Sequence, residues 1–102
     1  MKYSDNQIKD MILLSNYHLE ISYNDQIIKV IEELSSLNRL LAKFLLGEIK
    51  QHDIELLDEL FDADFMIFQL KRMLVSDEYM MVLYNSVVNS KLEREIKRWG
   101  LV

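Results

Sequence analysis

The feature that most restricts the fold of this chain is the near absence of residues that break helices. Its 102 residues contain no proline and only two glycines, Gly47 and Gly100. An all-β fold needs many tight turns, and tight turns are built mainly from glycine, proline, asparagine and aspartate. The chain is therefore predicted to be all-α, with long helices joined by short connections.

Apolar residues at three- and four-residue spacing predict four helices in a four-helix-bundle-type domain that spans residues 1–102. A short N-terminal helix is expected to follow Ser4, a capping residue, and residues 17–25 are expected to form an irregular connection with a second cap at Asn24. The three longer helices are predicted over residues 25–46, 52–75 and 76–99. Gly47 is a natural stop for the first of these.

The third predicted helix is apolar on two sides. One face carries Leu56, Leu60, Ala63, Ile67, Leu70 and Leu74, and the other carries Ile54, Phe61, Phe65 and Phe68. A helix that is apolar on two sides is buried on two sides. In so small a chain the second face is expected to meet another subunit, so the protein is predicted to form homo-oligomers.

The charge balance and the lack of cysteine narrow the partners and the compartment. Seventeen acids against 12 bases give a net charge of −5, which disfavours nucleic acid as a partner. Without cysteine there are no disulfides, thiolate metal sites or cysteine nucleophiles, which suits a reducing compartment. No segment approaches the roughly 20 apolar residues that span a bilayer, and the N-terminal segment lacks the apolar core of a signal peptide. We expect a cytoplasmic protein with no membrane partner.

Acidic residues recur in the most apolar part of the chain, ELLDELFDADF at residues 55–65. Glu59 and Asp62 are three residues apart, so their side chains are neighbours on a helix, with about 5–6 Å between their Cβ atoms. Glu33 stands at the edge of the apolar stripe on the preceding helix. Because a short connection makes these two helices antiparallel neighbours, the three carboxylates are expected to converge.

Convergent carboxylates without histidine are hard oxygen ligands. They suit Mg²⁺ or Mn²⁺, which bind through a few carboxylates together with substrate phosphates. The alternative for acids on an amphipathic helix is a solvated face, and this interpretation is favoured for Glu55 and Asp58. Asp64 projects among apolar residues, and we expect it to belong to a structural ion pair.

The order and spacing of these segments resemble the MazG-like, all-α nucleotide pyrophosphohydrolases, especially the small single-domain members common in phages. The similar segments are IEELSSLNRLLAKFLLG, IELLDELFDADFMIFQLKRML and SKLEREIKR, within about residues 25–98. The family's signature is Glu-x-x-Glu, a connecting segment, and then Glu-x-x-Asp. Here ELSS supplies Glu33, and ELFD supplies Glu59 and Asp62.

The resemblance implies a hydrolase that cleaves a nucleoside triphosphate, or a related nucleotide, between its α- and β-phosphates to give the monophosphate and pyrophosphate. It also implies that Glu33, Glu59 and Asp62 are the catalytic metal ligands and that Mg²⁺ or Mn²⁺ is the cofactor. Lys91 and Arg94, on the last helix, would approach the substrate phosphates or would form a solvated basic face. Members of the family work as dimers or tetramers.

One position departs from the signature, because Ser36 stands where the family has its second glutamate. A hydroxyl is a poorer Mg²⁺ ligand than a carboxylate. Glu32 points about 100° away from Glu33 on a helix and is a poor substitute. Two alternatives to an active enzyme therefore stay open. One is a catalytically impaired MazG-like module that binds nucleotide or protein, and the other is a helical bundle unrelated to nucleotides.

Overall fold

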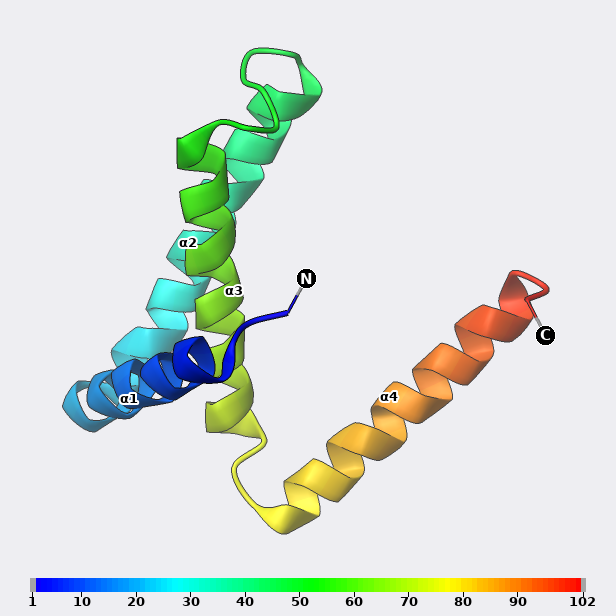
Figure 1. Ribbon diagram of the computed structural model, residues 1–102. Coiled ribbons are helices and arrows are strands. Elements are labelled where there is room, and N and C mark those ends of the chain that lie inside the picture. Colours follow the sequence, from blue (N-terminus) through cyan, green and yellow to red (C-terminus); the bar gives the residue numbers. More distant parts are fainter. Residues whose placement is uncertain (1, 102) are drawn as a thin grey trace. The chain divides into compact units, whose positions relative to one another are not determined.

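The computed structural model describes residues 2–101, which form four helices and no strand (Figure 1). The helices are α1 (Asp5–Ile21), α2 (Tyr23–Leu45), α3 (Ile54–Leu74) and α4 (Glu78–Arg98). The prediction of an all-α fold is confirmed. The chain divides after Leu70 into two units, so that the last turn of α3 and all of α4 belong to the second. Within the described residues, no helix combines the length and the apolar character that crossing a bilayer requires.

Local capping chemistry sets several of the helix ends. Ser4 caps α1 as predicted, because its Oγ accepts a hydrogen bond from the Gln7 backbone N–H and the Gln7 side chain accepts one from the Ser4 N–H. Asp77 caps α4 by accepting a hydrogen bond of 2.7 Å from the Met80 N–H. Gly47 ends α2 with a φ of 77°, and the next N–H, that of Glu48, donates to the Lys43 carbonyl.

The prediction of an irregular connection at residues 17–25 is wrong. α1 continues to Ile21 and α2 begins at Tyr23, so Ser22 alone separates the two helices, and Asn24 lies inside α2. No proline or glycine interrupts this stretch, and the Ser22 N–H still donates to the His18 carbonyl at 3.1 Å. The first helix is therefore 17 residues long, longer than the short helix that was predicted.

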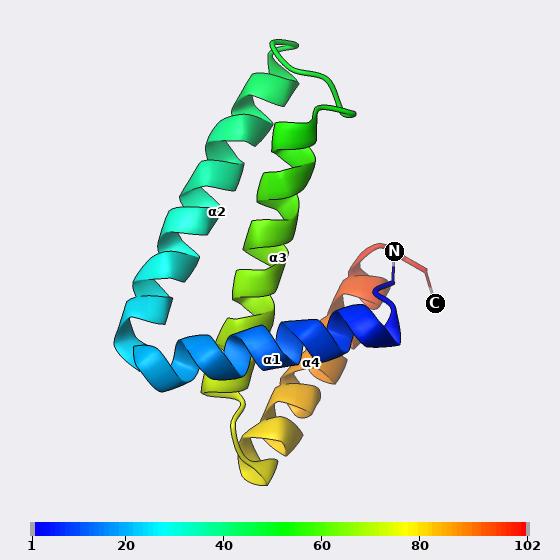
Figure 2. The same cartoon turned by 60° about the vertical axis from the view of Figure 1, so that its left-hand side comes forward.

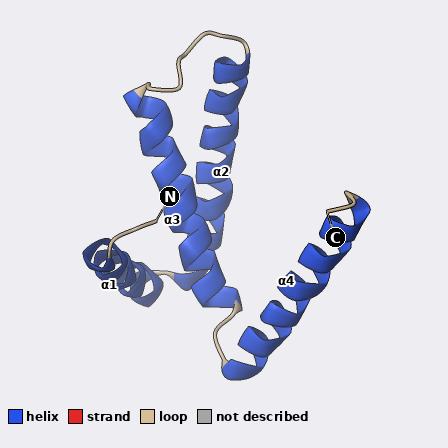
Figure 3. Ribbon diagram, turned by 45° about the vertical axis from the view of Figure 1, so that its right-hand side comes forward, coloured by secondary structure: helices blue, strands red, loops and turns tan. Residues whose placement is uncertain are grey.

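The first unit, residues 2–70, is built from α1, α2 and most of α3. Figures 1 and 2 show α2 and α3 side by side with α1 crossing them, and Figure 3 shows the loop at 46–53 that joins α2 to α3. The core of this first unit contains Met11 from α1, Val30 from α2, and Phe65 and Met66 from α3, all of them buried. Each such side chain stabilises the fold by about 1.5–3 kcal/mol. The core therefore ties together all three helices of this unit.

The second apolar face of α3 lies partly inside this core. Phe65 is buried against Met11 and Val30, and Phe68 packs against the same cluster. Phe61, by contrast, keeps 41% of its surface exposed.

A polar pair lies buried between α2 and α3. The Gln69 Nε2 donates a hydrogen bond of 2.7 Å to the Gln26 Oε1, and Gln69 is fully buried. Leaving a buried polar group without its partner costs about 1–3 kcal/mol, so apolar replacement of either glutamine alone is unfavourable. The sequence pattern gave no indication of this pair, because neither glutamine belongs to a recognisable motif.

The second unit, residues 71–101, consists mainly of α4. Ion pairs run along its C-terminal half, with Lys97 at 3.0 Å from Glu93 and Arg98 at 3.7 Å from Glu95. None of the residues of α4 is buried, and most of its large apolar side chains, such as Val87, are exposed, while Met80 and Val88 are half-buried. A single helix of this length is marginally stable in water, and helices in proteins are stabilised mainly by packing of an apolar face. The apolar side of α4 is therefore a candidate interaction surface.

Candidate metal centre

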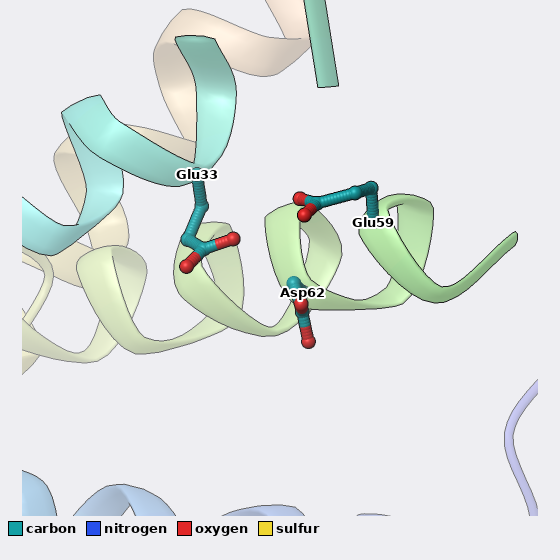
Figure 4. Close-up of side chains that lie close together, drawn as sticks. All are labelled: Glu33, Glu59 and Asp62. Carbon is teal, nitrogen blue, oxygen red and sulfur yellow. The ribbon is translucent and has the colours of Figure 1, made fainter. Parts of the chain in front are cut away.

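The helices α2 and α3 bring the three predicted acids together. Figure 4 shows Glu33 projecting from α2 toward Glu59 and Asp62 on α3, and one carboxylate oxygen of each residue lies within 4.8 Å of the others. All three side chains are half-buried. In an octahedral Mg²⁺ site with oxygens at 2.0–2.1 Å, neighbouring ligands are about 2.9 Å apart and only opposite ones are about 4.2 Å apart. Side-chain movements of about 1 Å would therefore bring these oxygens onto one ion. We call Glu33, Glu59 and Asp62 the acidic triad.

The hydrophobic core explains why the triad comes together. Glu33 follows the buried Val30 by three residues, and Asp62 precedes the buried Phe65 by three. Residues three apart on a helix lie on the same face, so each acid sits one turn from a core side chain. The contact between Val30 and Phe65 in one cluster therefore holds the two acids at the same level.

The electrostatics of the triad favour a bound cation. Burial raises the pKa of Glu59, and the negative charges of Glu33 and Asp62 raise it further. Burial, together with the charge of Asp58, also raises the pKa of Asp62. In the described part of the chain, the Glu59 Oε2 is covered from solvent and accepts no hydrogen bond. A divalent cation would offset the repulsion and give this oxygen a partner.

These raised pKa values predict how the stability of the metal-free protein depends on pH. The pKa values of Glu59 and Asp62 lie above their ordinary values of 4.5 and 3.8, so the folded chain binds protons more tightly than the unfolded chain. The contribution of Glu59 and Asp62 to stability is fully present at pH values below their ordinary pKa values. It is lost as the pH rises through their raised pKa values in the folded chain. We expect Glu59→Gln to increase the free energy of unfolding by roughly 0.5 kcal/mol at neutral pH, the size of an exposed charge interaction.

Urea unfolding in the presence of a chelator, at neutral pH and at about pH 3.5, measures this effect. At the acidic pH the gain from Glu59→Gln should disappear, because the wild-type carboxyl is already protonated. Glu55→Gln is the matched control, since Glu55 is exposed one turn earlier on the same helix. An equal gain at both pH values, or a loss at neutral pH, would contradict the expected repulsion within the triad.

A pocket of about 350 Å³ lies beside the triad. Glu33 and Asp62 form part of its wall, and the other residues that line it are Leu14, His18, Gln26, Lys29, Phe61, Phe65 and Met66. Its size and its mixture of apolar walls with a few polar groups are typical of sites for small molecules. Sequence reasoning did not single out Lys29 or His18 for this site. The spacing from Lys29 to Glu33, four residues on one helix, was a signal that could have identified the lysine.

Three further candidate residues, Ser36, Lys91 and Arg94, lie outside the triad. Ser36 is half-buried one turn after Glu33 on α2, so a hydroxyl occupies the position of the family's second glutamate. Lys91 and Arg94 are exposed on α4, in the second unit. Their contact with substrate phosphates stays a prediction.

The remaining acids of the 55–65 segment lie outside the triad. Glu55 and Asp58 are exposed, which confirms the solvated face predicted for them. Asp64 accepts a hydrogen bond from the Tyr3 hydroxyl, and this bond raises the pKa of Tyr3. A neutral donor from the segment before α1 thus takes the place of the cation expected beside Asp64. This contact ties the N-terminal segment to α3.

The chain matches no protein-family model, no curated protein and no solved structure. The resemblance to MazG-like pyrophosphohydrolases therefore rests on the order of the acids in the chain and on the segments around them. The geometry of the triad is an observation independent of that resemblance. Together they motivate the proposal that follows.

Proposed function

We propose that this protein is a metal-dependent nucleotide pyrophosphohydrolase, which cleaves a (d)NTP to the (d)NMP and pyrophosphate. The observation that carries the proposal is the acidic triad, whose carboxylate oxygens come within 4.8 Å of one another across two helices. An all-oxygen set of ligands suits Mg²⁺ or Mn²⁺. The resemblance of the segments around the triad to the MazG-like family supports the choice of reaction.

Each residue of the triad has a role in this reaction. Glu33, Glu59 and Asp62 would hold the ion, which supplies positive charge that offsets the charge developing on the phosphate oxygens. A carboxylate of the triad would accept a proton from the attacking water. Water then adds to the α-phosphorus, and the bond to the β-phosphate oxygen breaks to release pyrophosphate.

The alternative proposal is a catalytically impaired module that binds nucleotide or a protein partner through its helices. The observation that favours it is Ser36, which leaves three acids where the family has four. Three carboxylates suffice for one Mg²⁺ ion, which often uses only one or two protein carboxylates and keeps several waters. The active enzyme is therefore the preferred proposal.

Incubation with a panel of (d)NTPs and Mg²⁺ or Mn²⁺ tests the two proposals. We expect the wild-type protein to release pyrophosphate from at least one nucleotide, and a chelator to stop the release. If the wild type is inactive, Ser36→Glu decides between the proposals: a gain of turnover would mean that only a ligand is missing from an otherwise competent site. No turnover in either protein would reject the enzyme.

We also infer that the protein forms a homo-oligomer, a dimer or a tetramer. The support is the exposed apolar side of α4 and the exposed leucines of the first unit, among them Leu34, Leu41 and Leu60. Apolar surface of this extent is typical of protein interfaces rather than of free helices. A cytoplasmic location without a nucleic-acid or membrane partner remains our expectation from composition.

A further inference from the structure

We infer that the pocket beside the triad binds the whole nucleotide, with Lys29 holding a substrate phosphate and His18 contacting the base. This inference rests on the proposed function, which it deepens by naming the groups that recognise the substrate. It concerns the first unit alone, because α1, α2 and α3 supply every residue that lines the pocket.

Lys29 is placed to meet a phosphate next to the triad. It stands four residues before Glu33 on α2, so both side chains lie on the same face, and both line the pocket. Within residues 2–101, Lys29 forms no ion pair, although Glu33 is in range along the helix. Lysine before glutamate is the less favourable order for such a pair. The ammonium group is therefore available to a ligand, and lysine is a common phosphate-binding residue.

Lys29 does not serve to neutralise the triad itself. Within residues 2–101, no ion pair joins Lys29 to Glu33, Glu59 or Asp62. A lysine placed for structural compensation would pair with one of these acids. The arrangement of one free cation beside an uncompensated acidic cluster instead fits a ligand that carries phosphates and brings a divalent ion.

The aromatic residues that line the pocket suit a planar group that forms hydrogen bonds. The His18 Nδ1 is covered from solvent and has no hydrogen-bond partner among the described residues, although covered polar atoms are usually paired. The His18 ring packs edge-on against Phe65 at 6.0 Å, and Phe65 stacks on Phe61 at 6.1 Å. Nucleobases stack on aromatic rings and present polar edges, and Phe61, which lines the pocket and is 41% exposed, offers a ring that a base could reach.

The pocket is thus lined by both charged and aromatic side chains. Glu33, Asp62 and Lys29 are the charged residues, while Phe61, Phe65 and His18 are the aromatic ones. A nucleoside triphosphate has groups that suit both kinds of side chain, whereas an inorganic polyphosphate could use the charged ones only. The volume of about 350 Å³ lies within the range for small-molecule sites. We therefore expect base-containing substrates to be preferred over inorganic polyphosphates.

Calorimetric titration with Mg²⁺ and a nucleoside triphosphate whose α,β-bridge cannot be hydrolysed tests this inference. We expect Lys29→Gln to weaken binding about tenfold, the loss of one charge-assisted hydrogen bond, and to weaken binding of the monophosphate less. Lys43→Gln is the matched control, because Lys43 is exposed on the same helix and does not line the pocket. Its affinity should stay within twofold of wild type.

The variant His18→Phe tests the aromatic side of the pocket wall, because it keeps a ring against Phe65 and removes the imidazole nitrogens. We expect this variant to bind the nucleotide analogue about fivefold to tenfold more weakly and to bind inorganic tripolyphosphate unchanged. Circular dichroism and thermal unfolding check that each variant is folded. A third variant, Glu59→Ala, reports on the metal centre separately.

The outcomes distinguish this inference from the proposed function. If Glu59→Ala abolishes Mg²⁺-dependent binding while Lys29→Gln and His18→Phe bind as wild type, the pocket assignment is overturned and the metal centre stands. If the nucleotide binds without any dependence on Mg²⁺ but Lys29→Gln weakens it, the pocket stands and the metal-dependent function fails. Equal effects of His18→Phe on nucleotide and tripolyphosphate would overturn the contact with the base.

Discussion

Replacing Glu59 with alanine is expected to lower the rate of pyrophosphate release by at least about 100-fold. The Glu59 carboxylate is one of three that would hold the ion, and its oxygen Oε2 has no other partner in the described chain. Removal of residues that only support a metal ligand already costs about 10–100-fold in affinity or activity. Loss of a ligand from a set of three, with Ser36 unable to replace it, should cost at least as much.

The measurement is continuous detection of pyrophosphate at a fixed nucleotide concentration across a range of Mg²⁺ concentrations. Glu55→Ala is the control, because Glu55 is exposed one turn earlier on α3 and lies outside the triad. Its rate should remain within twofold of wild type. Since Glu59→Ala also removes a charge from a repulsive cluster, the variant should be folded. Unchanged turnover in a folded Glu59→Ala protein would exclude the triad as the metal centre.

If the protein forms the homo-oligomer that we propose, replacing Val87 with glutamate is expected to convert it into a monomer. Val87 lies at the middle of α4, where 57% of its surface is exposed in the single chain. If α4 packs on another copy, the new carboxylate is forced into an apolar interface, and burying an unpaired charge there costs several kcal/mol. A loss of this size corresponds to a dissociation constant at least about 100-fold higher.

Light scattering on a size-exclusion column at micromolar concentration measures the effect. The wild-type mass should be at least twice the chain mass of 12.2 kDa, and the variant should elute with the mass of one chain. Asn89→Glu is the matched control, because Asn89 is two residues further along and points to the opposite side of α4. A monomeric wild type would reject self-association, and an oligomeric Val87→Glu protein would locate the interface away from this side of α4.

The helix ends that could be predicted from the sequence are those determined by a few neighbouring atoms. Ser4 and Asp77 cap their helices through their own side chains, and Gly47 adopts a positive φ that other residues avoid. Ser22 and Asn24 have the same capping chemistry, yet Asn24 lies inside a helix. Helical packing of α1 and α2 into one core outweighs local preference there, and a single sequence contains no signal for that packing.

The convergence of the triad was predictable because it needs only helical spacing and a short connection. The covering of α3 was not, because a periodic pattern shows that a face is buried but not which element buries it. Phe65 meets α1 of its own chain, where the pattern suggested another subunit. His18 could not be assigned to the pocket, because the segment around it was taken as a connection rather than as the last turn of α1.

The buried glutamine pair has a consequence for the alignment of the metal centre. A slip of α2 along α3 by one turn would move their side chains about 5.4 Å past one another, which would carry Glu33 out of reach of Glu59 and Asp62. The apolar contacts of the core oppose such a slip. The hydrogen bond between Gln69 and Gln26 opposes it further, since a shifted α2 would leave the fully buried Gln69 Nε2 without its partner. The hydrogen-bonded pair therefore favours the alignment of α2 along α3 in which the three acids meet.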